Sequence, residues 1–310
     1  MLNSFRTVVE NVAILFIMIG VGYACSKFRV ITQRGASQIT TVLLYIVSPC
    51  LIVFSLQDTI GSVSMQAIAV AGGVAILAHV VAIAISTLLF RKSEERRKKV
   101  LRFALVYSNC GFMGLPLAQA VLGSQGVVYA SVYMSVFNVF VWTHGFGMMS
   151  GGEKISFKKI VLNPGVIGLA VGLPLFACSI HLPGVIGTPL SNFSALNTPL
   201  AMLVIGGYIA RVNFRELFLD KDVYWVSFYR LVLVPAVFLG VLCLLKPAPM
   251  VFVSCMMLSS APTAANTVLF AAQYGSDVKL ASKAVAITTL LSIFTMPIFA
   301  VLAQMLAKGT

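Results

Sequence analysis

The feature that most constrains this chain is a series of apolar runs, each about 20 residues long, that alternate with short charged breaks. At a rise of ~1.5 Å per residue, a helix of that length crosses the ~30 Å hydrocarbon core of a lipid bilayer. Only helices and closed barrels can span lipid, and these runs are too long for barrel strands. The sequence therefore predicts an all-α, polytopic membrane protein.

Composition agrees with this prediction, because 59% of the 310 residues are hydrophobic and only 10% are charged. Soluble domains carry about 25% charged residues. Ten spans use about 200 residues, which leaves only short connections and no room for a soluble domain. The predicted spans are residues 7–26, 36–56, 65–90, 101–122, 126–149, 161–180, 190–210, 223–245, 249–273 and 279–306.

The positions of the basic residues predict the orientation of the spans. The chain has 22 Lys and Arg against 9 Asp and Glu, and eighteen of the 22 lie in the loops after spans 1, 3, 5, 7 and 9. Such a bias marks the cytoplasmic side, so both termini face outward and the RKSEERRKK stretch (residues 91–99) is a cytoplasmic loop. The net charge of +13 then reflects orientation in the cell membrane, and no nucleic-acid partner is expected.

The six cysteines all lie in or beside apolar runs, and none forms a CxxC pair. They are interpreted as free, buried thiols. No metal site and no cofactor are predicted from them.

Three pairs of segments indicate an internal repeat. YIVSPCLIVFS (residues 45–55) resembles ALNTPLAMLVI (residues 195–205) at an offset of 150, and Gly22 matches Gly172 at the same offset. GSQGVVYAS, which starts at residue 123, resembles GSDVKLAS, which starts at residue 275. A unit of five spans is odd, so the second copy enters the membrane inverted. The sequence thus predicts two inverted five-helix repeats, residues 1–150 and 151–310, an architecture of secondary transporters.

The fourth span of each repeat contains helix-breaking residues. Asn109, Gly111, Gly114 and Pro116 crowd into span 4, and SSAPTAANT surrounds Pro262 in span 9. Proline removes a backbone donor and glycine permits unwound geometry. The alternative is a kinked helix whose small residues serve close packing. Because the breaks fall at corresponding positions, the pattern favours a binding site.

Two half-helix N-termini that meet near the midplane would present free N–H groups and positive dipole ends, which suit a carboxylate. The side chains that could add neutral donors to this substrate site are Ser108, Asn109, Ser260, Thr263 and Asn266.

Ionisable residues within the spans are few, and each has two possible roles. Arg230 in span 8 either snorkels to the interface or pairs with an anionic substrate. His79 and His144 are either proton carriers or hydrogen-bonded packing residues. No acidic residue lies at the predicted crossing, which argues against a carboxylate sodium site but leaves carbonyl and hydroxyl ligands open.

Several motifs, in this order, resemble those of the auxin efflux carrier family. They are NCGFMGLP (residues 109–116), NPGVIG (residues 163–168), Pro262 followed by Asn266, Tyr274 and Gly275, and TTLLSIFTMP (residues 288–297). The resemblance covers essentially the whole chain. It is to the bacterial, malate/malonate permease-like members, because the connection between the halves (residues 150–160) is short.

The resemblance implies ten spans, broken crossing helices 4 and 9, an elevator-type mechanism, organic-anion substrates and a homodimer formed through spans 2 and 7. It places Asn109 where the family asparagine contacts the substrate carboxylate, with Asn163 as a second candidate. Span 9 departs from the plant pattern because it carries APTAAN (residues 261–266).

We therefore predict a secondary active transporter of small organic anions, either mono- or dicarboxylates, and not an enzyme. The alternative carrier is a sodium-coupled organic-anion symporter of the related bile-acid-transporter-like fold. A membrane-embedded enzyme would need clustered Asp, Glu or His, and a receptor-like sensor would normally bring a soluble signalling domain. The chain has no Walker motif, so ATP drive within this chain is not supported. The sequence leaves open whether transport is coupled to protons, to sodium, to the membrane potential or to nothing.

Overall fold

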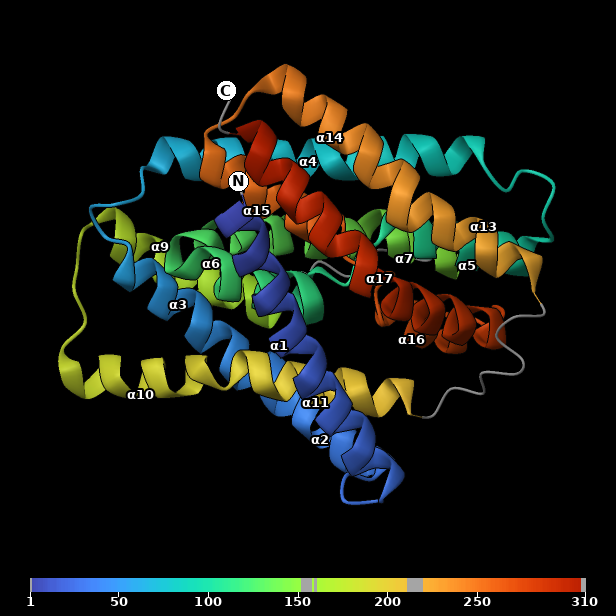
Figure 1. The fold of residues 1–310 in the computed structure, drawn as a ribbon, viewed down its shortest axis with the longest axis horizontal. Coiled ribbons are helices and arrows are strands. Elements are labelled where there is room, and N and C mark those ends of the chain that lie inside the picture. The colour runs from blue at the N-terminus through green and yellow to red at the C-terminus, as the bar shows by residue number, and fades with distance from the viewer. Residues whose placement is uncertain (1, 152–157, 159–160, 211–219, 308–310) are drawn as a thin grey trace.

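The computed structural model describes residues 2–151, 158, 161–210 and 220–307. In these ranges all the regular elements are helices (Figure 1). Five helical segments are long and apolar enough to cross a membrane, and shorter apolar helices accompany them. The protein is therefore a multi-pass, all-α membrane protein.

The first half of the chain forms ten helical elements, of which those named η are π-helical. They are α1 (Leu2–Lys27), α2 (Gln33–Val42), η1 (Leu43–Val47), α3 (Ser48–Asp58), α4 (Met65–Leu88), α5 (Glu95–Val106), η2 (Cys110–Gly114), α6 (Leu115–Phe140), η3 (Val141–Gly145) and α7 (Phe146–Ser150).

In the second half, short connections again separate the described helices. They are α9 (Pro164–Ala177), α10 (Gly184–Ala195), α11 (Asn197–Ile209), α13 (Lys221–Phe228), η4 (Tyr229–Leu233), α14 (Val234–Leu245), α15 (Pro249–Ser259), α16 (Asn266–Gln273) and α17 (Val278–Ala307).

The predicted span at 190–210 differs from the structure. Helix α10 already begins at Gly184, after Pro183 has fixed an extended backbone, and Leu196 separates it from α11. The sequence prediction started too late because the polar stretch GTPLSN (residues 187–192) lowers the local hydropathy.

Gly123 explains how two predicted spans adjoin. The helical stretch Cys110–Ser150 has 41 residues, which is about 60 Å of helix and twice the bilayer core. Within it Gly123 has φ 63° and ψ −156°, a conformation that is essentially restricted to glycine. The short half-helix after the break therefore ends at Gly123, and a separate long helix continues towards α7.

Two helix pairs approach each other so closely that only glycine fits. A Cβ on Gly22 of α1 would lie 2.5 Å from the Leu203 carbonyl oxygen of α11, and one on Gly206 would overlap the α1 backbone. In the pair α3–α9, a Cβ on Gly172 would lie 3.3 Å from Val53 Cα. Small residues at such crossings are typical of membrane helices.

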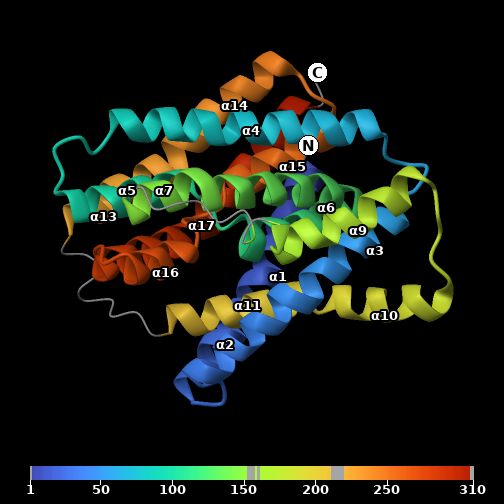
Figure 2. The same cartoon turned by 180° about the vertical axis from the view of Figure 1, so that it is seen from behind.

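Helices α1, α2, α3, α9, α10 and α11 form one group; in Figure 2, α10 and α11 lie in the lower part of the molecule and α2 extends below them. Helices α4, α13, α15 and α17 contact α5 or α6 in a second group, and α14 packs on α4, α15 and α17. The broken helices lie in this second group, and η2 and α6 contact α1 and α11 of the first.

All six cysteines are free, but the prediction that all are buried was wrong. Cys110 and Cys255 are buried, whereas Cys178 is exposed because it lies where α9 ends in a short turn.

Candidate functional site

The two interrupted helices meet each other at their breaks. Helix α5 ends at Val106 and α15 ends at Ser259, and non-helical segments follow each of them. The segments pair in antiparallel fashion, with the Asn109 N–H donating to Pro262 O at 2.6 Å and the Ala264 N–H donating to Tyr107 O at 2.9 Å. We call this paired region, residues 107–109 with 260–265, the crossing.

Glycine permits the close approach around the crossing. A Cβ on Gly114 of η2 would lie 2.9 Å from Leu258 Cγ and 3.2 Å from Leu258 Cα, so the side-chain-free surface lets η2 lie against α15. Gly111 has more space, because a Cβ there would meet only Met134 Sδ at 3.5 Å. The two glycines that the sequence singled out thus differ in their packing.

On one side of the crossing, Arg230 binds backbone carbonyls. Its Nη1 donates to Leu105 O at 3.0 Å, its Nε to Ala261 O at 3.1 Å, and its Nη2 to Ser259 O and Ala261 O. We call these carbonyls, with Val106 O, the carbonyl side. Helix C-termini leave carbonyls without intrahelical partners and carry partial negative charge, so the guanidinium satisfies both half-helices at once.

Arg230 is only 1% exposed, so its side chain does not snorkel to the interface.

Arg230 lies in a π-helical turn that is followed by a proline. This turn, η4, ends two positions before Pro235. The π turns η1 and η2 likewise end two positions before Pro49 and Pro116. Proline removes an N–H and clashes with the carbonyl four residues earlier, which a wider π turn accommodates. The spacing accompanies these three turns but does not by itself locate one, because η3 has no such proline and Pro174, Pro189 and Pro297 lie in α-helices without a π turn.

The opposite side of the crossing holds the N-terminal ends of η2 and α16, which we call the amide side. The first N–H groups of a helix have no intrahelical partner and carry partial positive charge. Asn109 precedes η2, is 7% exposed, and its side-chain amide makes no hydrogen bond with the described residues. The Ser108 hydroxyl is also buried without a described partner, and the half-buried Asn266 opens α16. Unpaired polar groups therefore gather here.

Two predicted site residues instead use their hydroxyls to satisfy backbone carbonyls. Thr263 Oγ1 donates to Ala104 O at 3.0 Å, and Ser260 Oγ donates to Met257 O at 3.1 Å. The Thr263 N–H donates to Thr288 Oγ1 of α17 at 3.2 Å. Sequence reasoning missed Thr288 as a crossing residue, although it opens the TTLLSIFTMP run.

Asn163 lies at the start of α9. Its Oδ1 accepts hydrogen bonds from the Gly165 N–H and from Asn138 Nδ2, both at 3.0 Å. Met134 connects this cap to the crossing, because it lies beside both Gly111 and Gly165. Asn163 thus caps a helix, and the side chain of Met134 lies between this cap and the amide side. The contact of Asn163 with substrate stays a prediction.

The two histidines have different surroundings. His79 of α4 is buried, lies with Nδ1 2.7 Å from Ala75 O, and stacks on Phe140. His144 of η3 is half-buried, and its Nδ1 lies 2.9 Å from the Tyr107 hydroxyl. Only His144 therefore contacts a crossing residue. Whether either histidine carries protons stays a prediction.

A small apolar cavity lies beside the amide side, where η2 and α6 face α1, α11 and α17. Met113, Met202, Met296 and Ile19 contribute to its lining, and its volume is about 20 Å³. This is room for about one water molecule. The groups on either side must separate before an organic anion can enter here.

Comparison with known proteins identifies the family. A family model described as "Membrane transport protein" matches residues 7–156 and, a second time, residues 153–300. The chain belongs to this family. It is the auxin efflux carrier family that the sequence motifs resemble, so that prediction is confirmed.

Relatives with the same overall length carry transporter names. The chain is 27% identical over 307 residues to an "Uncharacterized transporter" of Methanothermobacter thermautotrophicus, covering 94% of this chain and 97% of the relative. It is 22% identical over 305 residues to one of Methanocaldococcus jannaschii, with the same coverage. A Rhizobium meliloti protein named "Putative malonate transporter" is 25% identical over 219 residues, 67% of this chain and 68% of the relative. Membership and relatives point to a membrane transporter and not to an enzyme.

Proposed function

We propose that this membrane transporter is a secondary carrier of small organic anions that binds the substrate carboxylate at the amide side of the crossing. The observation that carries the proposal is the asymmetry of the crossing. The carbonyl side is saturated by a buried guanidinium, whereas the amide side presents the side-chain amide of Asn109 and the hydroxyl of Ser108 without described hydrogen-bond partners. Helix N-termini bind carboxylates and phosphates for the same electrostatic reason.

The carrier architecture that we propose has ten spans in two inverted repeats, residues 1–150 and 151–310, with both termini outside the cytoplasm. The family model matches each half separately. In addition, Gly22 lies against Leu203 while Gly172 lies against Val53. Both glycines and both partners are related by an offset of 150 residues, so each half supplies one glycine and one partner helix. These contacts support an internal pseudo-symmetry.

We propose that the two helix groups move relative to each other during transport, as in an elevator. The cavity between them has only about 20 Å³, so this conformation cannot admit a carboxylate between the groups. A hydrogen bond of 3.1 Å between Gln119 of α6 and Thr198 of α11 also joins them. Alternating access then requires this contact to break. The first group, which contains spans 2 and 7, would also form the proposed homodimer contact.

Arg230 bears on coupling and distinguishes the main alternative. In sodium-coupled carriers with broken helices, half-helix C-termini and unwound carbonyls coordinate the cation. Here a guanidinium already binds these carbonyls. We therefore expect transport without sodium, in contrast to a sodium-coupled symporter of the bile-acid-transporter-like fold. A malonate-like dicarboxylate is the first substrate to test, because one relative carries that name.

The decisive experiment is uptake of radiolabelled malonate, malate and monocarboxylates into proteoliposomes that contain the purified protein. We expect saturable uptake of at least one anion, which falls by about 10- to 100-fold in Asn109→Ala. The matched control is Asn192→Ala, because Asn192 is an exposed asparagine of α10. If none of the tested anions showed saturable uptake, or if the two variants took up the anion equally well, the proposal would be contradicted.

The same vesicles test coupling. We expect the initial rate to stay unchanged when an inward sodium gradient replaces a choline gradient. A sodium-dependent rate would favour the symporter instead. A pH gradient series then measures whether protons move with the anion.

A further inference from the structure

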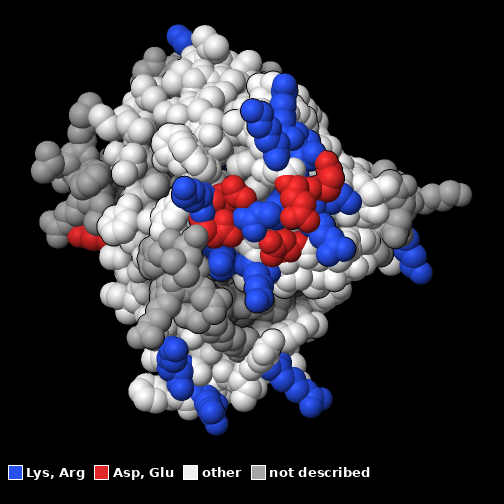
Figure 3. Space-filling model, turned by 90° about the vertical axis from the view of Figure 1, so that its right-hand side faces the viewer, with Lys and Arg blue, Asp and Glu red and all other residues white. Residues whose placement is uncertain are grey.

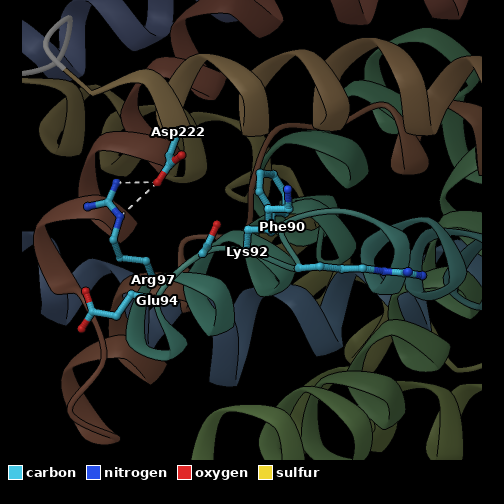
Figure 4. A pocket seen from close by; sticks show the side chains of 7 residues that line it. Phe90, Lys92, Glu94, Arg97 and Asp222 are labelled. Carbon is cyan, nitrogen blue, oxygen red and sulfur yellow. Dashed lines mark hydrogen bonds and ion pairs between the residues drawn. The ribbon is translucent and has the colours of Figure 1, made fainter.

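We infer that a pocket between α4, α5 and α13 binds the headgroup of an anionic phospholipid. The pocket has a volume of about 470 Å³ and is open on one side. Its wall is formed by Phe90, Arg91, Lys92, Ser93 and Glu94 of the α4–α5 loop together with Arg97 and Asp222 (Figure 4). This inference concerns a surface away from the crossing and does not rest on the proposed transport mechanism.

Apart from Glu94, an exposed carboxylate of the wall that forms no ion pair among the described residues, the acidic groups around this pocket already have basic partners. Arg97 forms ion pairs with Asp220 at 2.8 Å, with Asp222 at 2.7 Å and with Asp277 at 3.2 Å. Lys98 pairs with Glu95 and lowers the pKa of that carboxyl. Figure 3 shows a cluster of acidic side chains in the middle of this face, with Lys and Arg between and around them.

Two cations of the pocket remain available to an anion. Arg91 and Lys92 are exposed, and neither forms an ion pair within the part of the chain that the structure describes. Arg91 Nε donates only to Thr87 O, at 3.3 Å, so the end of its guanidinium can still receive a phosphate oxygen. The neighbouring Ser93 hydroxyl adds a neutral donor. Adjacent Arg, Lys and Ser donors match a phosphodiester.

The surroundings of the pocket place it at the membrane surface. Trp225 and Phe228 of α13 are 55% and 50% exposed, and Leu88 at the end of α4 is 64% exposed. Phe90 packs edge-on against Tyr229, on which Trp225 stacks, with both pairs of ring centroids 5.7 Å apart. Exposed Trp and Tyr mark the headgroup level of a bilayer. Acyl chains can therefore cover Leu88, Trp225 and Phe228 while the phosphate lies against Arg91 and Lys92.

This combination favours a lipid over a soluble anion. A free phosphate would need only the cations, whereas the exposed apolar side chains beside them suit a ligand with acyl chains. Basic pockets at the ends of transmembrane helices on the positively charged side bind anionic headgroups. The loop after span 3 carries the largest basic cluster of this chain, which places it on that side.

The test uses the full-length protein in detergent, incubated with phosphatidylglycerol or with phosphatidylcholine of identical acyl chains, and counts bound lipid by native mass spectrometry. We expect the wild-type protein to retain phosphatidylglycerol preferentially. The double variant Arg91→Gln/Lys92→Gln should retain at least about tenfold less phosphatidylglycerol and the same amount of phosphatidylcholine. Because both residues are exposed, the thermal unfolding midpoint should not change.

The matched control is Arg29→Gln/Arg34→Gln, which removes the same charge from two exposed residues, one in the loop after α1 and one in the first turn of α2. It should retain as much phosphatidylglycerol as the wild type. Equal losses in both double variants would indicate diffuse charge attraction and overturn the proposed site. Displacement of the lipid by excess inorganic phosphate, or unchanged binding by the Arg91→Gln/Lys92→Gln variant, would overturn it as well.

Discussion

The two sides of the crossing arise from the same helix breaks, but they differ in whether their polar groups have hydrogen-bond partners. Both exist because α5 and α15 stop near the middle of their spans and leave backbone groups without helical partners. On the carbonyl side one side chain, Arg230, donates to four backbone carbonyls that the two helix ends leave open. On the amide side the side-chain amide of the neighbouring Asn109 has no described partner. The difference teaches that a chain can complete one half of a broken helix pair itself, and under the proposed function the other half is completed by the substrate.

The largest effect should follow from removing the guanidinium. Arg230→Met leaves four buried carbonyls without donors and should lower the free energy of unfolding by about 3–5 kcal/mol. Thermal unfolding in detergent, followed by intrinsic fluorescence, measures this change. Arg230→Lys keeps the charge but lacks the planar fork of donors, so its loss should be smaller. An unfolding midpoint for Arg230→Met equal to the wild-type value would show that the carbonyl side does not depend on this residue.

The amide side should give the reverse result. In Asn109→Ala we expect affinity for the transported anion to fall by about 1.5–3 kcal/mol, because a hydrogen bond to a charged group is lost. The unfolding midpoint without substrate should stay close to the wild-type value, since this amide has no described partner. Substrate-induced shifts of the midpoint measure both quantities. A loss of stability as large as that of Arg230→Met would remove the distinction between the two sides.

The packing of η2 against α15 gives a third comparison. Gly114→Ala places a Cβ 2.9 Å from Leu258 Cγ and should cost about 1–3 kcal/mol of unfolding free energy. Gly111→Ala is the matched control, since its Cβ meets only Met134 Sδ at 3.5 Å. We expect no loss for the control. Similar midpoints for the two variants would contradict the close approach at Gly114.

The smallest effect concerns the acceptor for the Thr263 N–H. Thr288→Val removes this acceptor and should cost about 1 kcal/mol. The neighbouring Thr289→Val loses only a hydroxyl bond to Val285 O within α17 and should cost less. Equal losses would show that the bond between Thr288 and the crossing adds nothing to the stability.

Much of the site could be predicted from sequence because proline and glycine act locally. Pro262 and the cluster of Asn109, Gly111 and Gly114 mark the two breaks, and the structure brings these breaks into hydrogen-bonding contact. The hydroxyl partners could not be predicted in the same way. Thr263 and Ser260 are chemically able to bind an anion, but each donates to a nearby carbonyl instead, and that choice depends on the packing of other helices.

The sequence by itself determined that the chain lies in a membrane, where its helices break and which loops carry the basic charge. Bilayer thickness imposes the length of each apolar run, and a missing N–H acts within a single turn. Only the tertiary structure decided what Arg230 binds. Its acceptors Leu105 and Ala261 lie 125 and 31 residues away along the chain. A guanidinium reaches such distant carbonyls only when packing brings three helices together, and no local pattern encodes that contact.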